Sequence, residues 1–271
     1  DLHSFPTRRS SDLVVGVILS VRLPRLVGAV LVGAALALSG ATYQSLFKNP
    51  LVSPDLLGIS SGACVGAAFA ILLDFPYPLI QLSALGMGLF TVFLTTLIPK
   101  LFRNKSSLML VLSGVIMSGF MSAILGIAKY VADPEDHLAS IVYWMMGAFS
   151  NARLKNVLLV SPPMLVSMTV LLLLRWRINL LSLGDAEAKS LGVNVKRARA
   201  LTILCSTVLT ACAVCLCGTI GWLGLIVPHL GRLVIGQDNR HLLPMSAVLG
   251  ALFLVIVDNY QIGRASCRER V

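Results

Sequence analysis

The chain has 271 residues, of which 56% are hydrophobic and only 13% are charged, and its mean hydropathy is +0.86. Such a composition excludes an ordinary soluble domain of this length and indicates a polytopic membrane protein. The net charge of +10 does not indicate nucleic-acid binding. Basic loops beside apolar segments account for most of it, and the chain has no aromatic–basic RNA motif.

Apolar segments follow one another along the chain. A bilayer core about 30 Å thick requires roughly 20 apolar residues per helix, so the sequence predicts an all-α, polytopic membrane helix bundle with eight spans. They cover Leu26–Phe47, Leu56–Leu73, Leu79–Leu97, Leu108–Val131, Val157–Leu174, Ala200–Cys217, Ile220–Ile235 and Leu242–Val257. The seventh is short and interrupted by glycine.

The loops between these spans predict their orientation, because cytoplasmic loops collect Lys and Arg. Lys100–Lys105 contains three basic residues and Arg175–Arg199 contains six, so both are expected on the cytoplasmic side. Asp74–Pro78 and Ala132–Ser140 contain none and are expected outside. The first predicted span then runs from outside to inside.

Both ends of the chain differ in character from the rest. Residues 1–13 and 261–271 are polar, show no helical period and resemble translated sequencing-adaptor sequence. We therefore expect an incomplete transmembrane domain over residues 14–260 and a native protein that extends beyond both ends.

The sequence offers no residue set for catalysis or metal binding. Cys212, Cys215 and Cys217 lie in an apolar run without a nearby His or carboxylate, so we interpret them as packing residues. No nucleophile, base and orienting group occur at a plausible spacing, which predicts that the chain is not an enzyme. No Asp or Glu precedes Asp258 within the spans, and no G-x-x-x-x-G-K-S/T loop is present, so no cofactor is expected.

Small residues recur at helical spacing in two segments. The ladders are Gly58, Gly62 and Gly66, and Gly114, Ser118, Ser122 and Gly126. Spacing alone favours tight helix packing, because small residues allow close backbone approach in lipid. The second ladder also carries hydroxyl groups, and Gly114, Ser118 and Ser122 are therefore candidates for lining a translocation path.

The segment Leu181–Arg199 is a polar island between two long apolar runs. Asp185 is a good helix N-cap and Gly192 a good helix stop, which predicts a helix of about two turns, on the order of 9 Å long. Such a helix does not persist alone in water. It could lie on the lipid headgroups, but its small apolar face favours docking to a cytoplasmic partner.

Arg22 and Arg25 flank Pro24, which suits the first turn of a helix, and the predicted orientation puts them outside. Simple anchoring at the membrane interface would explain both arginines.

Four ordered stretches resemble the permease subunits of type II ABC importers of the FecCD family, which take up iron-siderophores, haem and cobalamin. They are Val21–Ala68, Tyr143–Phe149, Leu180–Val195 and Gly218–Pro244. The likeness runs from about Val14 to Asp258 with its spacing intact. The family's first and last helices have no counterpart, which predicts a permease domain truncated at both ends.

This resemblance implies a ten-helix permease fold, about eight spans of it visible, in the cytoplasmic (inner) membrane of a bacterium. It implies a homodimer or heterodimer of permeases, two cytoplasmic ATPase subunits that bind the ATP, and an external substrate-binding protein. It assigns a coupling helix, which fits a cleft on the ATPase, to Gly184, Asp185, Ala188, Leu191 and Gly192. It also implies that Arg22, with Arg25 beside it, lies at the docking surface for the binding protein, where Arg22 would pair with a carboxylate.

The resulting hypothesis is an ATP-driven importer of an iron-siderophore, haem or cobalamin, in which a partner ATPase drives alternating access of the permease. An ion-coupled secondary transporter is the alternative from another class, and it requires an ionisable residue within the membrane. An integral membrane enzyme ranks last, because no active site is evident.

Overall fold

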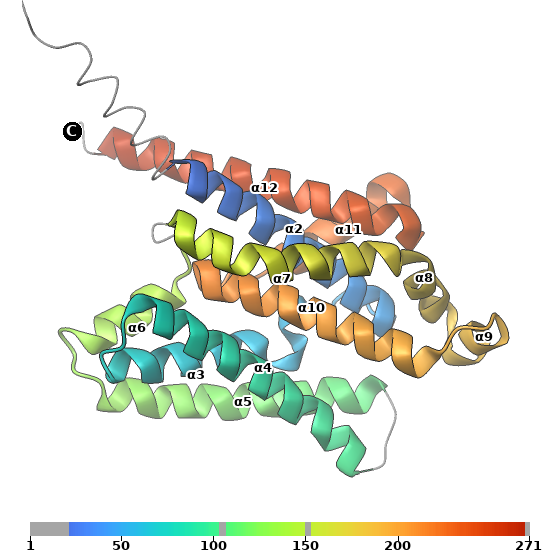
Figure 1. The fold of residues 1–271 in the computed structure, drawn as a ribbon, viewed down its shortest axis with the longest axis horizontal. Coiled ribbons are helices and arrows are strands. Elements are labelled where there is room, and N and C mark those ends of the chain that lie inside the picture. Colours follow the sequence, from blue (N-terminus) through green and yellow to red (C-terminus); the bar gives the residue numbers. More distant parts are fainter. Residues whose placement is uncertain (1–21, 103–106, 150–152, 269–271) are drawn as a thin grey trace, which may run out of the picture.

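A computed structural model describes residues 22–102, 107–149 and 153–268 (Figure 1). Every regular element in these ranges is helical, which confirms the all-α fold class. The elements are α2 (Leu23–Phe47), the 3-10 helix η2 (Pro54–Leu57), α3 (Ile59–Leu72), α4 (Tyr77–Leu101), α5 (Ser107–Val131), α6 (His137–Met145), α7 (Leu154–Leu173), α8 (Arg175–Leu183), α9 (Asp185–Ser190), α10 (Val195–Cys217), α11 (Leu223–Ile235) and α12 (Asn239–Arg268). The predicted tail over residues 1–13 lies outside the described residues, and α12 continues past residue 260.

Each of the eight predicted spans coincides with a helix, but only six helices of the described part are long and apolar enough to cross a membrane. The predicted spans Leu56–Leu73 and Ile220–Ile235 are corrected to the shorter helices α3 and α11, of 14 and 13 residues. Both begin late because a residue with positive φ precedes them, Gly58 at 78° and Trp222 at 67°. Helices of this length rise only about 20 Å, less than the apolar core of a bilayer.

Local hydrogen bonds explain where α3 begins. The Asp55 side chain in η2 accepts from the backbone N–H of Ser60 at 2.7 Å, as a capping group does at a helix N-terminus. The hydroxyl of Thr95 in α4 donates to the carbonyl of Leu57 at 3.1 Å. At the break between η2 and α3, side chains therefore form hydrogen bonds with backbone groups, which stabilises the break.

Helix α2 is the centre of one half of the fold. Its most apolar window is 72% buried, against 33% for those of α4, α7 and α12, and α2 contacts α7, α10, α11 and α12. A Cβ atom at Gly33 would overlap the carbonyl oxygen of Gly250 in α12, and one at Gly40 would overlap that of Gly224 in α11. Close backbone approach of this kind is how helices associate in lipid.

Helices α3, α4 and α5 form the other half, and α10 lies between the two halves (Figure 1). A Cβ atom at Gly66 would overlap the carbonyl oxygen of Ser83 in α4, and one at Gly62 would overlap the hydroxyl of Thr91. The ladder that begins at Gly58 therefore packs α3 against α4, as its spacing predicts.

The ends of the bundle agree with the predicted orientation. The C-terminal end of α4 and the N-terminal end of α5 lie at the same end as α8 and α9, and α6 lies at the opposite end (Figure 1). The basic segments thus share one end, which we take as the cytoplasmic end, and the acidic loop before α6 is external.

Replacing Gly33 with alanine tests the contact between α2 and α12. The new methyl group would meet backbone atoms of Gly250, which no flexible side chain can relieve, so the helices must separate. We expect the free energy of unfolding to fall by about 1–3 kcal/mol, measured by thermal unfolding in detergent. Gly28→Ala is the matched control, because a Cβ atom there meets its nearest neighbour at an ordinary 3.6 Å. Equal losses in the two variants would contradict the prediction.

Candidate functional site

The polar segment Leu181–Arg199 contains the short helix α9, which has six residues and a length of about 9 Å. Its N-cap is Gly184, so the prediction of Asp185 as the N-cap is wrong by one residue. The carboxylate of Asp185 does not cap the helix because it accepts a hydrogen bond from Nη2 of Arg199 at 2.8 Å. Asp185 and Glu187 lie in the first turn, where their negative charges stabilise the helix by interacting with the positive end of its dipole.

The C-terminal end of α9 has the two hydrogen bonds of a Schellman motif. The N–H of Gly192 donates to the carbonyl of Lys189, and the N–H of Val193 donates to that of Ala188, both at 2.9 Å. Gly192 has φ of +79°, a left-handed conformation that glycine adopts without strain. The prediction that Gly192 ends this helix is therefore confirmed.

One face of α9 is packed and the other is exposed. Ala188 is fully buried in a cluster with Tyr43, Leu181 and Val193, and Gly184 is buried at the turn from α8. Asp185, Leu191 and Gly192 are exposed, Leu191 with 55% of its surface accessible. The five residues predicted for the coupling helix therefore divide into two that seat the helix and three that a partner could contact.

A cavity of about 320 Å³ lies beside the C-terminal end of α9. Its lining residues are Trp176, Arg177, Leu191, Gly192, Val193, Asn194 and Arg197. Sequence reasoning did not find the contribution of Trp176 and Arg177. Both belong to α8, which lies in the segment Arg175–Arg199 that was interpreted from the sequence as a basic loop. The cavity extends the candidate partner-binding surface beyond α9.

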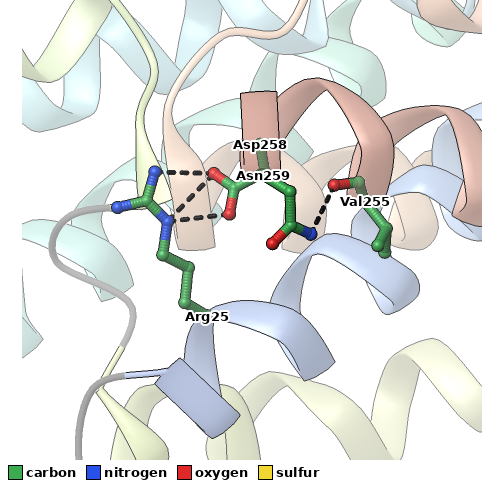
Figure 2. A network of polar contacts seen from close by, with 4 residues as sticks. All are labelled: Arg25, Val255, Asp258 and Asn259. Atoms are coloured by element: carbon green, nitrogen blue, oxygen red, sulfur yellow. Dashed lines mark hydrogen bonds and ion pairs between the residues drawn. The ribbon is translucent and has the colours of Figure 1, made fainter. Parts of the chain in front are cut away.

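At the external end, the two arginines of the predicted docking surface have different surroundings. Arg22 is exposed. Arg25 forms an ion pair with Asp258 of α12, in which its Nε lies 2.8 Å and its Nη2 lies 2.7 Å from the carboxylate oxygens (Figure 2). The Asp258 side chain is only 7% accessible. Arg25 thus joins α2 to α12, and Arg22 is the arginine that is available to a partner.

The three residues predicted for the translocation path also differ in their surroundings. A Cβ atom at Gly114 would overlap the carbonyl oxygen of Leu56, so Gly114 packs α5 against η2. Ser118 is half-buried near Gly58, whereas Ser122 is exposed. A Cβ atom at Gly119 or Gly126 would meet nothing within 4 Å, so Ser122 lies on an open face of α5. Within the described residues, no group of His, Cys, Asp and Glu could hold a metal ion.

Comparison with known proteins identifies the family. The FecCD transport family matches residues 3–264. The chain is 43% identical over 243 residues to the molybdate import system permease protein MolB of Haemophilus influenzae, covering 90% of this chain and 72% of that protein. It is 42% identical over 260 residues to an iron chelatin transport system permease protein of Helicobacter pylori, covering 94% and 77%.

A solved structure is also similar, with a TM-score of 0.86 and 43% sequence identity over 92% of this chain and 79% of the other. It is described as an inward-facing conformation of an ABC transporter of the metal-chelate type. The similarity covers the helix bundle and supports the arrangement of its helices.

The six long apolar helices of the described residues, the family match and the similar structure define the transmembrane subunit of an ABC transporter. The chain belongs to the FecCD transport family and is a permease subunit of a type II ABC importer, a multi-pass membrane protein. ATP is bound and hydrolysed by a separate ATPase, so the permease is not itself the enzyme. This assignment excludes the alternative of an ion-coupled secondary transporter.

Removing the cation of the external ion pair tests its importance. Arg25→Ala leaves the Asp258 carboxylate buried without a partner, and we expect the free energy of unfolding to fall by about 3–5 kcal/mol. Thermal unfolding in detergent measures this loss, with Arg22→Ala as the matched control on the same helix end. The double variant Arg25→Met, Asp258→Leu should recover most of the stability, because it removes both charges. Similar losses in Arg22→Ala and Arg25→Ala would refute this interpretation.

Proposed function

We propose that this permease imports a metal chelate, which is an iron-siderophore, haem or cobalamin. It works in a dimer with a second permease, identical or paralogous, above two ATPase subunits and below an external binding protein. The exposed face of α9 contacts the ATPase, and Arg22 contacts the binding protein. The observation that carries this proposal is the capped helix α9, seated by Ala188 with Leu191 outward.

The geometry of α9 suits a coupling element. ATP can drive alternating access only if the ATPase contacts the permease differently in its open and closed states. A helix whose ends are fixed by the Asp185–Arg199 contact and by the turn at Gly192 moves as a unit, so a displacement at its surface is not lost in local unfolding. An exposed leucine beside it supplies apolar contact area for a groove.

The open face of α5 supports a bulky cargo. Gly119, Ser122 and Gly126 lie about one turn apart, the two glycines have free space at their Cβ positions and Ser122 is exposed, so two copies of this face can border a wide route. Such a face offers small groups and a hydroxyl rather than a specific binding site. Molybdate is the second candidate, because a 43% identical relative is named for its import.

A matched pair of glycine variants tests the contact with the ATPase. Gly192 and Gly236 both have positive φ, +79° and +89°, and free space at the Cβ position. Valine at either site therefore carries a similar backbone cost of about 1–2 kcal/mol. Only Gly192→Val places a branched side chain next to Leu191 on the exposed surface at the end of α9, and we expect it to weaken ATPase association about tenfold in a quantitative pull-down from detergent. Unchanged association, or an equal loss in Gly236→Val, would refute a role for α9 in docking.

A size series at Ser122 tests the path and the cargo together. Ser122→Ala should leave uptake near the wild-type level, whereas Ser122→Leu and Ser122→Trp should reduce it progressively because they fill the open face of α5. Uptake is measured in cells with a labelled ferric siderophore, haem, cobalamin and molybdate, and ATPase association serves as the folding control. Uptake of molybdate alone would overturn the chelate proposal, and a tryptophan variant with full uptake would remove Ser122 from the path.

A further inference from the structure

The α8–α9 segment is attached to the membrane helices by hydrogen bonds from α8. Oδ1 of Asn179 accepts from the backbone N–H of Asn239 at 3.0 Å and from its Nδ2 at 3.2 Å. Nη1 of Arg175 donates to the carbonyl of Arg240 at 3.2 Å. These three bonds fix α8 to the N-terminal turn of α12, immediately before the chain enters α9.

A second helix joins the same point. Oδ1 of Asn239 accepts from the hydroxyl of Ser45 in α2 at 2.5 Å, and Asn239 is only 2% accessible. Nζ of Lys48, just beyond the C-terminal end of α2, donates to the carbonyl of Leu183 at 2.7 Å. Asn239 therefore bridges α2 and α8, and its buried polar groups would be costly to leave without partners.

Helices α2 and α12 are themselves held together along their length. Gly33 and Gly250 bring the two backbones into contact, and the ion pair of Arg25 and Asp258 joins the helices at the external end. The 25 residues of α2 extend about 37 Å, so the pair connects the two ends of the bundle. Figure 1 shows α2 beside α12 at the external end, and the hydrogen bond of Ser45 to Asn239 joins the two helices at the end near α8.

We propose that the hydrogen-bond network of Asn179, Asn239 and Ser45 is a mechanical joint. It transmits displacement of α8–α9 to the α2–α12 pair, and so to the external end that carries Arg22. Asn179 acts as a positioning residue in this joint. The inference rests on the proposed contact between α9 and the ATPase, because that contact supplies the displacement.

A joint that transmits displacement predicts a different result from a network that only stabilises the fold. A polar network that only stabilises the fold would affect the amount of folded transporter, not the work done by each molecule. Disrupting a joint that transmits displacement would leave ATPase binding and basal ATP hydrolysis intact but would uncouple hydrolysis from uptake. The two cases are distinguished by normalising uptake to the amount of folded, ATPase-bound transporter.

Two substitutions of Asn179 test the joint in the assembled transporter, reconstituted in liposomes with its ATPase and binding protein. Asn179→Leu removes the acceptor for both bonds from Asn239. We expect unchanged ATPase association and basal hydrolysis, and at least a tenfold loss of uptake per hydrolysed ATP. Asn179→Asp keeps the acceptor oxygens and places negative charge at the N-terminus of α12, which is favourable, so uptake should stay near wild type.

A milder pair of variants covers the case in which Asn179→Leu fails to fold. Ser45→Ala removes the hydroxyl that α2 donates to Asn239, and Ser39→Ala removes a buried hydroxyl of the same helix that contacts Thr210 of α10 instead. Each hydroxyl makes two buried contacts, Ser45 with the carbonyl of Ala41 and with Asn239, and Ser39 with the carbonyl of Ser206 and with Thr210, so the unfolding temperatures of the two variants should fall similarly. Only Ser45→Ala should reduce uptake per hydrolysed ATP.

Three results of the coupling measurements would overturn the joint. They are wild-type coupling in both Asn179→Leu and Ser45→Ala, equal losses of coupling in Asn179→Leu and Asn179→Asp, and equal losses in Ser45→Ala and Ser39→Ala. Loss of ATPase association in Asn179→Leu would also overturn it, because Asn179 would then only hold the docking surface. Failure of the proposed function is separate, since it appears as unchanged ATPase association in Gly192→Val.

Discussion

Close backbone contact between helices is the constraint on which the rest of this structure depends. Lipid is as apolar as the helix surfaces, so burial of apolar side chains gives little net attraction between spans, and association relies on packing and interhelical hydrogen bonds. Helix α2 meets this requirement with glycine at its contacts with α11 and α12 and with hydroxyl groups at its contact with α10. The positions of Arg22, Ser45 and Lys48 all follow from where α2 is held.

Much of the fold was predictable from sequence because apolar length and loop charge are local properties. The eight apolar segments, the shared end of the basic segments and the stop of α9 at Gly192 each depend on residues close together in the chain. The errors are also local. A run of apolar residues does not reveal that Gly58 and Trp222 adopt positive φ, so α3 and α11 were expected to be longer than they are.

The polar contacts that define the site were not predictable in the same way. Arg25 and Asp258 are separated by 233 positions, and Asn179 and Asn239 by 60. From the sequence, Arg25 was therefore expected only at an external docking surface, whereas in the structure its guanidinium group pairs with Asp258. Asp185 was expected to cap α9, and its pairing with Arg199, 14 positions later, depends on how the turn after Gly192 brings α10 back.

On the proposed roles of α9 and α5, the division of the bundle into two halves separates the coupling contacts from the cargo path. The α2–α12 pair and its contacts with α8 belong to one half, and the open face of α5 belongs to the other, with α10 between them. A change in α5 that suits a different solute need not disturb the contacts of Asn239 or Gly250. Relatives named for molybdate and for iron chelatin have nearly the same identity to this chain, 43% and 42%. Overall identity therefore does not identify the cargo, which must be determined by experiments on the proposed path itself.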